Sequence, residues 1–561
     1  MDSHVLPMNR FFHFFGALFT LFVIAFLWWP LAQLFGAALW NNAHLTNAIR
    51  QTLFSPVAGS LLRNTIFLGV FTSIGALILG APLGIALCRT PRMLRAVFAV
   101  LCVMPLAVPP IVLATCWLQV SRTPPARSMA AIAATQPAHI NPVFLSACVL
   151  ALCFFPIVAL TVATTLRRLP HDAEDAARGF GGSVSTWNRV LVPQLLPAIW
   201  GALGAVFLLS LWEMGAPDLL DARTYSVEIY RNLAADDALD MVGKNARAAL
   251  SSLPMILLSA PALWQVLRAI RHEWGRNTIE SNIEYSNASV ARHESVLVTG
   301  ASLIVLVLSP LLPLGVLAQA VGATDPALRI FAESWNDNSV EIFNTLQLST
   351  MCAAVSVFVA FLLALWWRTW INRAQNFALI CCVSPLLIAP ILHGVALVSF
   401  WNTPQFPLVS GLMNESGLQV LDVFYDWCAR FLMPLFGLLS RFVPLSILLL
   451  SVAARRTDNA LFEAAQNLGA TPTRASFDVL WRVLRAPMLG VFALIWALSG
   501  AELSVSVLTQ QPGGQPLTLP IFQLMHIFVM DKVAALCLFL CGFSAFMMSL
   551  CGVIALSGKR R

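Results

Sequence analysis

The stretch VFLSACVLALCFFPIVALTVATTL, residues 143–166, is an apolar run without a charged side chain. It exceeds the ~20 residues that an α-helix needs to cross the hydrocarbon core of a bilayer. Backbone groups inside lipid must hydrogen-bond within the segment, and the run lacks the alternation of a barrel strand. The sequence therefore predicts a transmembrane helix here, which ends at the basic pair Arg167 and Arg168.

Similar apolar runs recur along the whole chain of 561 residues, of which 58% are hydrophobic and 11% are charged. Soluble domains carry about 25% charged residues, so a water-soluble chain of this composition could not cover its surface. The runs predict about twelve transmembrane helices and hence an all-α membrane protein. They span Phe11–Trp40, Asn64–Leu87, Leu94–Leu118, Val143–Leu166, Leu196–Leu211, Ala248–Leu267, Val296–Val321, Asn344–Trp367, Phe377–Phe400, Phe431–Ala454, Met488–Leu508 and Val533–Leu556.

The basic residues predict the orientation of these spans. With the N-terminus inside the cell, roughly two thirds of the 34 Lys and Arg residues fall on the inner side, as the positive-inside rule requires. Both termini are then cytoplasmic, and the net charge of +7 reflects topology rather than nucleic-acid binding. The first run follows Arg10 but is far longer than the apolar region of a signal peptide, so we expect a retained helix.

An internal repeat divides the chain into two halves. Arg63–Leu68 resembles Phe343–Leu348 at an offset of 280, and Met104–Pro110 matches Ser384–Pro390 at the same offset. The offset then becomes 288, at which the basic pairs after the fourth span of each half align. Two halves of six spans each must share one orientation, so the repeat predicts a pseudo-twofold axis along the membrane normal.

The repeat also predicts the domain organisation. Residues 1–270 form the first transmembrane half, and residues 296–561 form the second. Residues 271–295 are basic and polar, and they are predicted to be a cytoplasmic linker without a domain of its own.

Two polar loops, each between the fourth and fifth span of its half, carry the strongest functional signal. In each loop an acidic residue is followed by two alanines, a glycine and a hydroxyl residue, at an offset of 288 between the loops. The residues are Asp175, Ala176, Ala177, Gly181 and Ser183 in loop 1, and Glu463, Ala464, Ala465, Gly469 and Thr471 in loop 2.

Local physical chemistry predicts that each loop is a helix, a turn and a second helix. The alanines favour a helix, and the acidic residue near its start suits the positive end of the helix dipole. Gly181 or Gly469 stands where a helix C-terminus needs a positive φ, and Ser183 or Thr471 is a suitable N-cap for the next helix, with Pro472 at the first helical position. An ordinary amphipathic connector is the simpler interpretation, but two copies at equivalent points of a repeat argue against chance.

This pattern resembles the EAA coupling loop of type I, binding-protein-dependent ABC importer permeases, and the resemblance covers nearly the whole chain. Loop 2 matches most closely, with Pro487 in the following span, whereas Asp175 replaces the family's glutamate in loop 1. The resemblance implies the MetI-like permease fold with two homologous six-helix halves. Fused two-repeat permeases are similar to the iron(III)-type branch, which has thiamine and phosphonate relatives, and residues 212–230 look most like iron(III)-type members.

The resemblance also implies partners and a location. In that family each loop docks on one subunit of a separate ABC ATPase dimer at the cytoplasmic side, and ATP-driven closure of the ATPases alternates access to a central path. A periplasmic or lipid-anchored solute-binding protein delivers the solute, and the chain spans the bacterial inner membrane.

The sequence predicts no chemistry in the chain itself. It has no G-x-x-x-x-G-K-[ST] phosphate loop, so ATP is expected to be bound and hydrolysed by the partner. No nucleophile and base stand together, and no His, Asp or Glu cluster predicts a metal site. The 12 cysteines contain no C-x-x-C pair and lie mostly in apolar runs, which favours small buried residues over metal or disulfide sites.

Three polar residues within the spans are candidates for lining the translocation path. A charge at the centre of a span costs about 2.5–3.5 kcal/mol, so each one needs a reason. Glu213 and Glu502 lie late in the fifth span of each half, either as carboxylates at the outer interface or at the outer mouth of the path. His393 follows the helix-bending Pro390 and is either a hydrogen-bonded packing residue or a solute contact.

Other classes of membrane protein remain as alternatives. An ion-gradient-driven secondary transporter with two six-helix repeats would use several intramembrane charges or broken-helix ion sites. A polytopic membrane enzyme would need a cluster of titratable residues at one membrane face. A channel or a scaffold does not predict the repeated loop.

Overall fold

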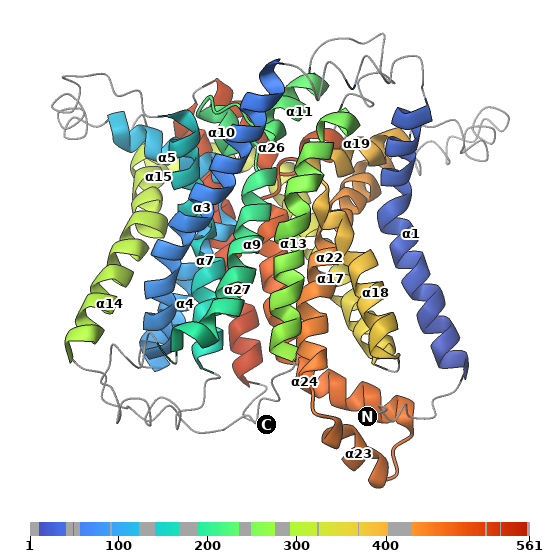
Figure 1. Cartoon of the computed structure of the whole chain (residues 1–561). Helices are drawn as coiled ribbons and strands as arrows, with labels where there is room; N and C mark the ends of the chain where they lie inside the picture. Colours follow the sequence, from blue (N-terminus) through green and yellow to red (C-terminus); the bar gives the residue numbers. More distant parts are fainter. Residues whose placement is uncertain are drawn as a thin grey trace.

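The computed structural model describes residues 10–40, 49, 56–89, 92–122, 141–167, 189, 191–234, 248–274, 292–322, 325–368, 370–401, 428–510, 513–527 and 529–557. Every regular element within these ranges is helical (Figure 1). The all-α fold predicted from the apolar runs is confirmed.

Ten helices of the described residues are long and apolar enough to cross a membrane, or up to twelve if each of two bent helix pairs counts as one span. This range includes the number predicted from the sequence. The long helices are α1 (Arg10–Trp40), α3 (Pro56–Arg89), α7 (Pro142–Leu166), α9 (Val192–Trp212), α13 (Leu253–Trp274), α14 (Arg292–Leu306) continued through η3 (Val307–Leu311) into α15 (Leu312–Val321), α17 (Ser339–Trp367), η5 (Cys428–Leu432) with α22 (Met433–Arg455), α24 (Pro472–Gly500) and α27 (Met530–Ser557).

The third predicted span of each half is not one straight helix. The first consists of α4 (Arg92–Val103), η1 (Met104–Ala107) and α5 (Pro110–Arg122), and the second of α18 (Asn372–Val383), η4 (Ser384–Leu387) and α19 (Pro390–Trp401). The helix pairs bend by 98° and 95° at these breaks. The prolines at the breaks cannot donate a backbone hydrogen bond and clash with the preceding turn, which ends the helix. The continuous runs Leu94–Leu118 and Phe377–Phe400 were therefore predicted too simply.

The fifth spans also differ from their predicted limits. α24 begins at Pro472 instead of Met488, because the cytoplasmic helix after loop 2 runs on into the span without interruption. It ends at Gly500, so the apolar residues up to Leu508 belong to a new segment.

Short helices complete the fold, namely α10 (Gly215–Leu219), α11 (Tyr225–Ala234), α16 (Ala327–Asp337), α23 (Asn459–Asn467), α25 (Ser506–Thr509) and α26 (Thr518–His526).

The long helices run side by side between two ends of the molecule (Figure 1). α23 projects at one end, where α1 begins and α27 ends, and we call this the α23 end. α10, α11 and α26 lie at the other end, which we call the α11 end. The residues of loop 1, Asp175 to Ser183, lie outside the described residues.

The first helix of each half packs against the other half. α1 contacts α17, α18 and α19, whereas α14 contacts α3. The indole Nε1 of Trp28 donates to the carbonyl oxygen of Cys381 at 3.0 Å, and that of Trp367 donates to Thr20 Oγ1 at 3.1 Å. On the other side, Ser309 Oγ donates to the carbonyl oxygen of Leu152 at 2.7 Å. The two sequence halves are therefore interleaved in space.

Small residues bring α3 and α7 into close contact. A Cβ atom built on Gly80 would lie 2.6 Å from the carbonyl oxygen of Phe155, and one on Gly84 would lie 2.6 Å from that of Ala159. Small residues at i and i+4 are a usual means of close helix packing in membranes, where lipid offers apolar surface everywhere. In α17, which packs against α22, the positions at the offset of 280 are held by the buried Ala360 and Ala364.

Replacing Gly84 by alanine should loosen this contact. The new methyl group meets a backbone carbonyl rather than a movable side chain, so we expect destabilisation of roughly 1–3 kcal/mol. The measurement is the thermal unfolding midpoint of the detergent-solubilised chain. Gly542→Ala in α27, where nothing lies within 4 Å, is the matched control and should be neutral or slightly stabilising. Equal midpoints for both variants would contradict the close α3–α7 contact.

Candidate functional site

Loop 2 is a bent helical element at the α23 end. α23 covers Asn459–Asn467, Gly469 adopts a φ of +89°, and Thr471 precedes α24, which starts with Pro472 at its first position. Glycine is the residue that reaches this φ without strain, so the helix–turn–helix predicted from Gly469 and Pro472 is present.

One detail of loop 2 was predicted wrongly. Glu463 lies in the middle of α23, whose first turn holds no acidic residue. The N-terminal role belongs to Asp458, whose Oδ1 accepts a hydrogen bond from the backbone N–H of Ala460 at 3.0 Å. Thr471 is the N-cap residue of α24, as predicted, although its side chain makes no capping hydrogen bond. An aspartate five residues before the Glu-Ala-Ala sequence was the available signal for the true start.

α23 presents one face outward and buries the other. Glu463, Ala464 and Gly469 are exposed, Ala465 is half-buried, and Leu468 is 89% exposed at the bend. Phe462 is 1% exposed and belongs to a small apolar cluster with residues of α17, α22 and α24. An exposed leucine beside an exposed acidic residue is a surface suited to a protein partner.

Arg368, at the end of α17, fixes α23 in place. Its guanidinium carbon lies 3.1 Å from the centroid of the Phe462 ring, and its Nη2 donates to Asn459 Oδ1 at 2.7 Å. Burial lowers the pKa of Arg368 to about 10, so the side chain stays positively charged at neutral pH. A cation over an aromatic ring is favourable, and more so where water is excluded. The contact joins residues that are far apart in the sequence and could not be predicted from loop 2 alone.

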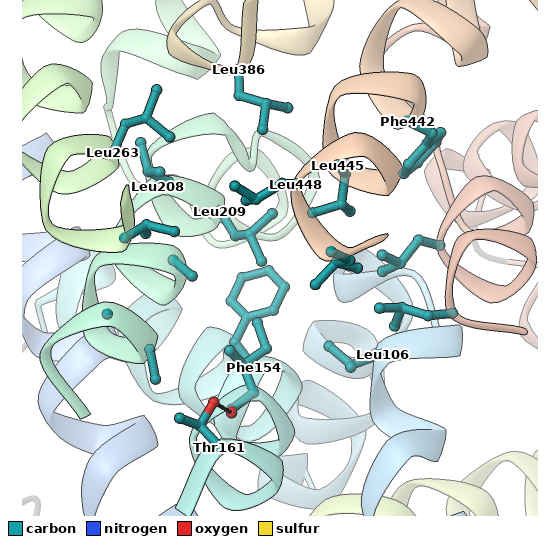
Figure 2. Close-up of a pocket in the computed structure, with 18 of the residues that line it drawn as sticks. Leu106, Phe154, Thr161, Leu208, Leu209, Leu263, Leu386, Phe442, Leu445 and Leu448 are labelled. Carbon is teal, nitrogen blue, oxygen red and sulfur yellow. Dashed lines mark hydrogen bonds between the residues drawn. The ribbon is translucent and has the colours of Figure 1, made fainter. Parts of the chain in front are cut away.

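A central cavity of about 410 Å³ lies between the two halves (Figure 2). α7, α9 and α13 supply one wall, and α22 and α24 supply the other. The breaks in the third spans also reach it, with Leu106 of η1 and Leu386 of η4. Figure 2 shows that much of its lining is apolar, with Phe154, Leu208 and Leu445 pointing inward.

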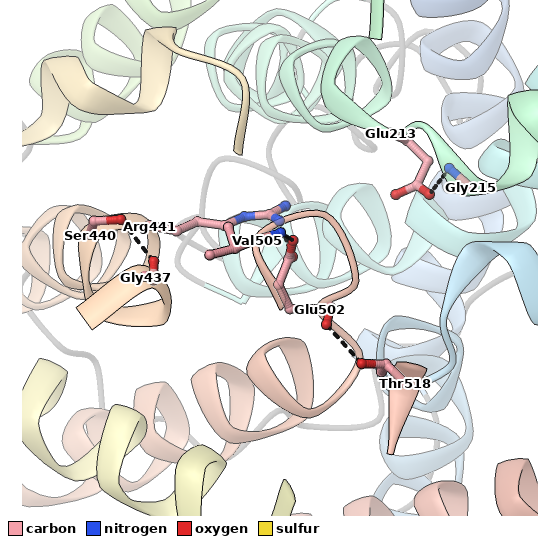
Figure 3. A network of polar contacts seen from close by, with 8 residues as sticks. All are labelled: Glu213, Gly215, Gly437, Ser440, Arg441, Glu502, Val505 and Thr518. Carbon is pink, nitrogen blue, oxygen red and sulfur yellow. Dashed lines mark hydrogen bonds and ion pairs between the residues drawn. The ribbon is translucent and has the colours of Figure 1, made fainter. Parts of the chain in front are cut away.

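Three of the charged residues that line this cavity, Glu213, Arg441 and Glu502, lie in one region (Figure 3). Glu213 follows α9, and its Oε1 accepts a hydrogen bond from the backbone N–H of Gly215 at 3.0 Å. Glu502 follows α24 and is 6% exposed. Its Oε2 forms an ion pair with Arg441 Nη1, and its Oε1 accepts from the backbone N–H of Val505 at 3.2 Å. The structure thus places both glutamates at the same cavity.

Arg441 is the residue that the sequence reasoning missed. It lies within α22, inside a predicted span, where an unpaired charge would be costly. A single arginine in an otherwise apolar run was the signal, because such residues face a partner or a cavity in the interior. Here Arg441 does both, since it pairs with Glu502 and lines the cavity.

His393 lies elsewhere. Its Nε2 is 3.2 Å from the carbonyl oxygen of Pro385, and its side chain is 4% exposed. It lines an apolar groove between α1 and the second half rather than the central cavity. Within the described part of the chain, no three His, Cys, Asp or Glu side chains lie close enough to hold a metal ion.

The segments that carry the two glutamates are held by equivalent hydrogen bonds. Ser226 Oγ donates to the carbonyl oxygen of Glu213 at 2.8 Å, and Thr518 Oγ1 donates to that of Glu502 at 3.1 Å. Thr65 Oγ1 accepts a hydrogen bond from the backbone N–H of Tyr225, the residue before Ser226, at 3.1 Å. In the second half, Thr345 Oγ1 accepts the equivalent hydrogen bond from the backbone N–H of Leu517, the residue before Thr518. The Asn-Thr pairs that revealed the repeat in the sequence thus perform the same task in each half.

The helices and their lengths define a multi-pass, all-α membrane protein whose fold is consistent with that of a permease. Among curated proteins, a segment of 215 residues is 27% identical to the Fe(3+)-transport system permease protein FbpB 2 of Haemophilus influenzae. The match covers 38% of this chain and 38% of the relative, so it spans well under half of either protein. No protein-family model and no solved structure matches the chain.

Removing the Arg368 side chain should free α23 without unfolding the spans. We expect Arg368→Ala to speed backbone amide exchange in α23 by roughly tenfold, because one cation–π contact and one hydrogen bond are lost. Hydrogen–deuterium exchange of the solubilised chain measures this. Arg474→Ala is the control, since Arg474 is exposed and contacts only Asp478 of its own helix among the ion pairs of the described residues. Unchanged exchange in Arg368→Ala would rule out the anchoring role.

Proposed function

We propose that this chain is the transmembrane permease subunit of an ABC importer, which forms the solute path and couples it to a separate ATPase through two cytoplasmic EAA loops. The observation that supports the proposal is the direct connection of α23 to α24 through the bend at Gly469. α24 is a rod of 29 residues, or ~43 Å at 1.5 Å per residue. It leads from the exposed surface of α23 to Glu502 at the central cavity, so a force on α23 would reach the path.

The two-repeat arrangement is part of this proposal. The equivalent hydrogen bonds of Thr65 and Thr345, and the two bent third spans, support two homologous six-helix halves. Loop 1, from Asp175 to Ser183, would then contact a second ATPase subunit. We further propose that the chain spans the bacterial inner membrane with both termini in the cytoplasm, and that a periplasmic or lipid-anchored solute-binding protein delivers the solute.

For the solute we propose iron(III), on the name of the Haemophilus relative and the resemblance of residues 212–230. Thiamine, a phosphonate or another small solute are the other candidates. The chain needs no cofactor of its own in this scheme, because ATP binds to the partner.

A secondary transporter driven by an ion gradient is the second candidate function. The cluster of Glu213, Arg441 and Glu502 is the observation that favours it, because ion-coupled transporters carry charges within the membrane. That function assigns no role to the exposed, anchored α23, which the importer explains.

The importer predicts that an ABC ATPase encoded beside the gene co-purifies with the solubilised chain. Glu463→Lys reverses a charge on the exposed face of α23, and Gly469→Asp forces a side chain onto a φ of +89°, so both variants should lose the ATPase. Glu333→Lys in α16 reverses a half-buried charge that pairs with Arg329, far from α23 along the chain, and should keep the ATPase. If no ATPase binds the unaltered chain, or if all variants retain it, the importer proposal fails and ion-gradient transport should be tested.

A further inference from the structure

The charged cluster occupies a particular position along the central cavity. On α9 and its C-terminal extension, the lining residue farthest toward the α11 end is Glu213. On α24 and its extension it is Glu502, and on α22 it is Arg441. From Arg441 the lining of α22 continues to Arg456 at the α23 end, a distance of ~22 Å along the helix. Along each of α9, α22 and α24, extensions included, the lining residue nearest the α11 end is therefore charged.

The cluster joins the two halves. Glu213 comes from the first half, whereas Arg441 and Glu502 come from the second. Arg441 is paired with Glu502, and it lines the same cavity as Glu213. Figure 3 shows the guanidinium beside the Glu502 carboxylate and the Glu213 carboxylate apart from both. One cation thus shares the cavity with an acidic residue from each half.

The ion pair between Arg441 and Glu502 is stronger than the attraction between Arg441 and Glu213. Breaking the buried Arg441–Glu502 pair would leave an uncompensated charge, which is strongly unfavourable. The attraction between Arg441 and Glu213 acts over a longer distance, and Glu213 keeps the hydrogen bond from Gly215 whatever Arg441 does. The halves can therefore separate along the line between Arg441 and Glu213 while the pair within the second half stays intact.

We propose that Arg441, with Glu213 and Glu502, is the outer gate of the solute path and is closed in this structure. The proposal rests on the proposed function, which makes the cavity a path. Arg441 neutralises two carboxylates that would otherwise repel each other across the closed gate. Opening moves Glu213 away with the first half, and Arg441 stays paired with Glu502.

The gate makes a prediction that a purely structural ion pair does not make. Arg441→Gln leaves two carboxylates from opposite halves facing each other, so repulsion should open the α11 end. Adding Glu213→Gln removes that repulsion and should close the end again. Neighbouring charges of one network are expected to be non-additive in this way, whereas two independent structural losses would add.

A cysteine placed just inside the gate reports the opening. Leu445 lines the cavity one helical turn from Arg441 on the side toward the α23 end, so Leu445→Cys can be labelled by a membrane-impermeant thiol reagent. Vesicles of each orientation are used, and the chain without Leu445→Cys gives the background from its own cysteines. We expect labelling from the α11 side to rise about tenfold in Arg441→Gln and to return near the starting rate in Arg441→Gln with Glu213→Gln.

Two outcomes would overturn the gate. The first is unchanged labelling from the α11 side in Arg441→Gln, and the second is a double variant that labels as fast as the single one. Arg441→Lys keeps the charge and should stay closed, which separates gating from general damage to the fold. The labelling uses no ATPase, ATP or solute, so a chain that binds no ATPase but shows the charge-dependent rescue would refute the importer and keep the gate.

Discussion

The ion pair between Arg441 and Glu502 exemplifies the constraint on which this structure depends, which is that polar groups among apolar helices must find partners inside the chain. Thr65 and Thr345 donate to carbonyls one turn back in their own helices and accept from backbone N–H groups of distant segments. Trp28 and Trp367 satisfy their indole nitrogens across the contact of α1 with the second half. These bonds fix which helices are neighbours, because apolar packing alone distinguishes poorly between one helix and another in lipid.

The same constraint explains why the charged residues of the cavity have partners within the chain. Its walls are helices whose backbone groups are bonded internally, so the lining is set by side chains, and most of them are apolar. Two of its charges follow helices, Glu213 after α9 and Glu502 after α24, because backbone N–H groups at the starts of the next short helices, α10 and α25, bond the carboxylates. α24 then connects Glu502 with α23, and Arg368 holds α23 against the base of α17. The proposed coupling and the proposed gate thus lie at opposite ends of one helix.

The sequence predicted much of this arrangement, and its failures have physical causes. Long apolar runs predicted the spans, because membrane helices are specified by local composition, and a glycine followed by a proline predicted the bend at Gly469. The broken third spans were not predicted, because the apolar runs continue through the prolines, and whether a proline bends a membrane helix or breaks it depends on the packing around it. Arg441 was overlooked within an apolar run. The Arg368–Phe462 contact and the packing of α1 on the second half depend on tertiary structure, which no local pattern reveals.

In the proposed complex, one copy of this chain supplies both halves of the transmembrane path and binds one ATPase subunit per half. The packing of α1 on the second half and of α14 on the first supports a complete unit within one chain. Native mass spectrometry of the solubilised chain with its co-purified ATPase measures this stoichiometry. We expect one copy of the chain with two ATPase subunits, whereas two copies of the chain in the complex would contradict it.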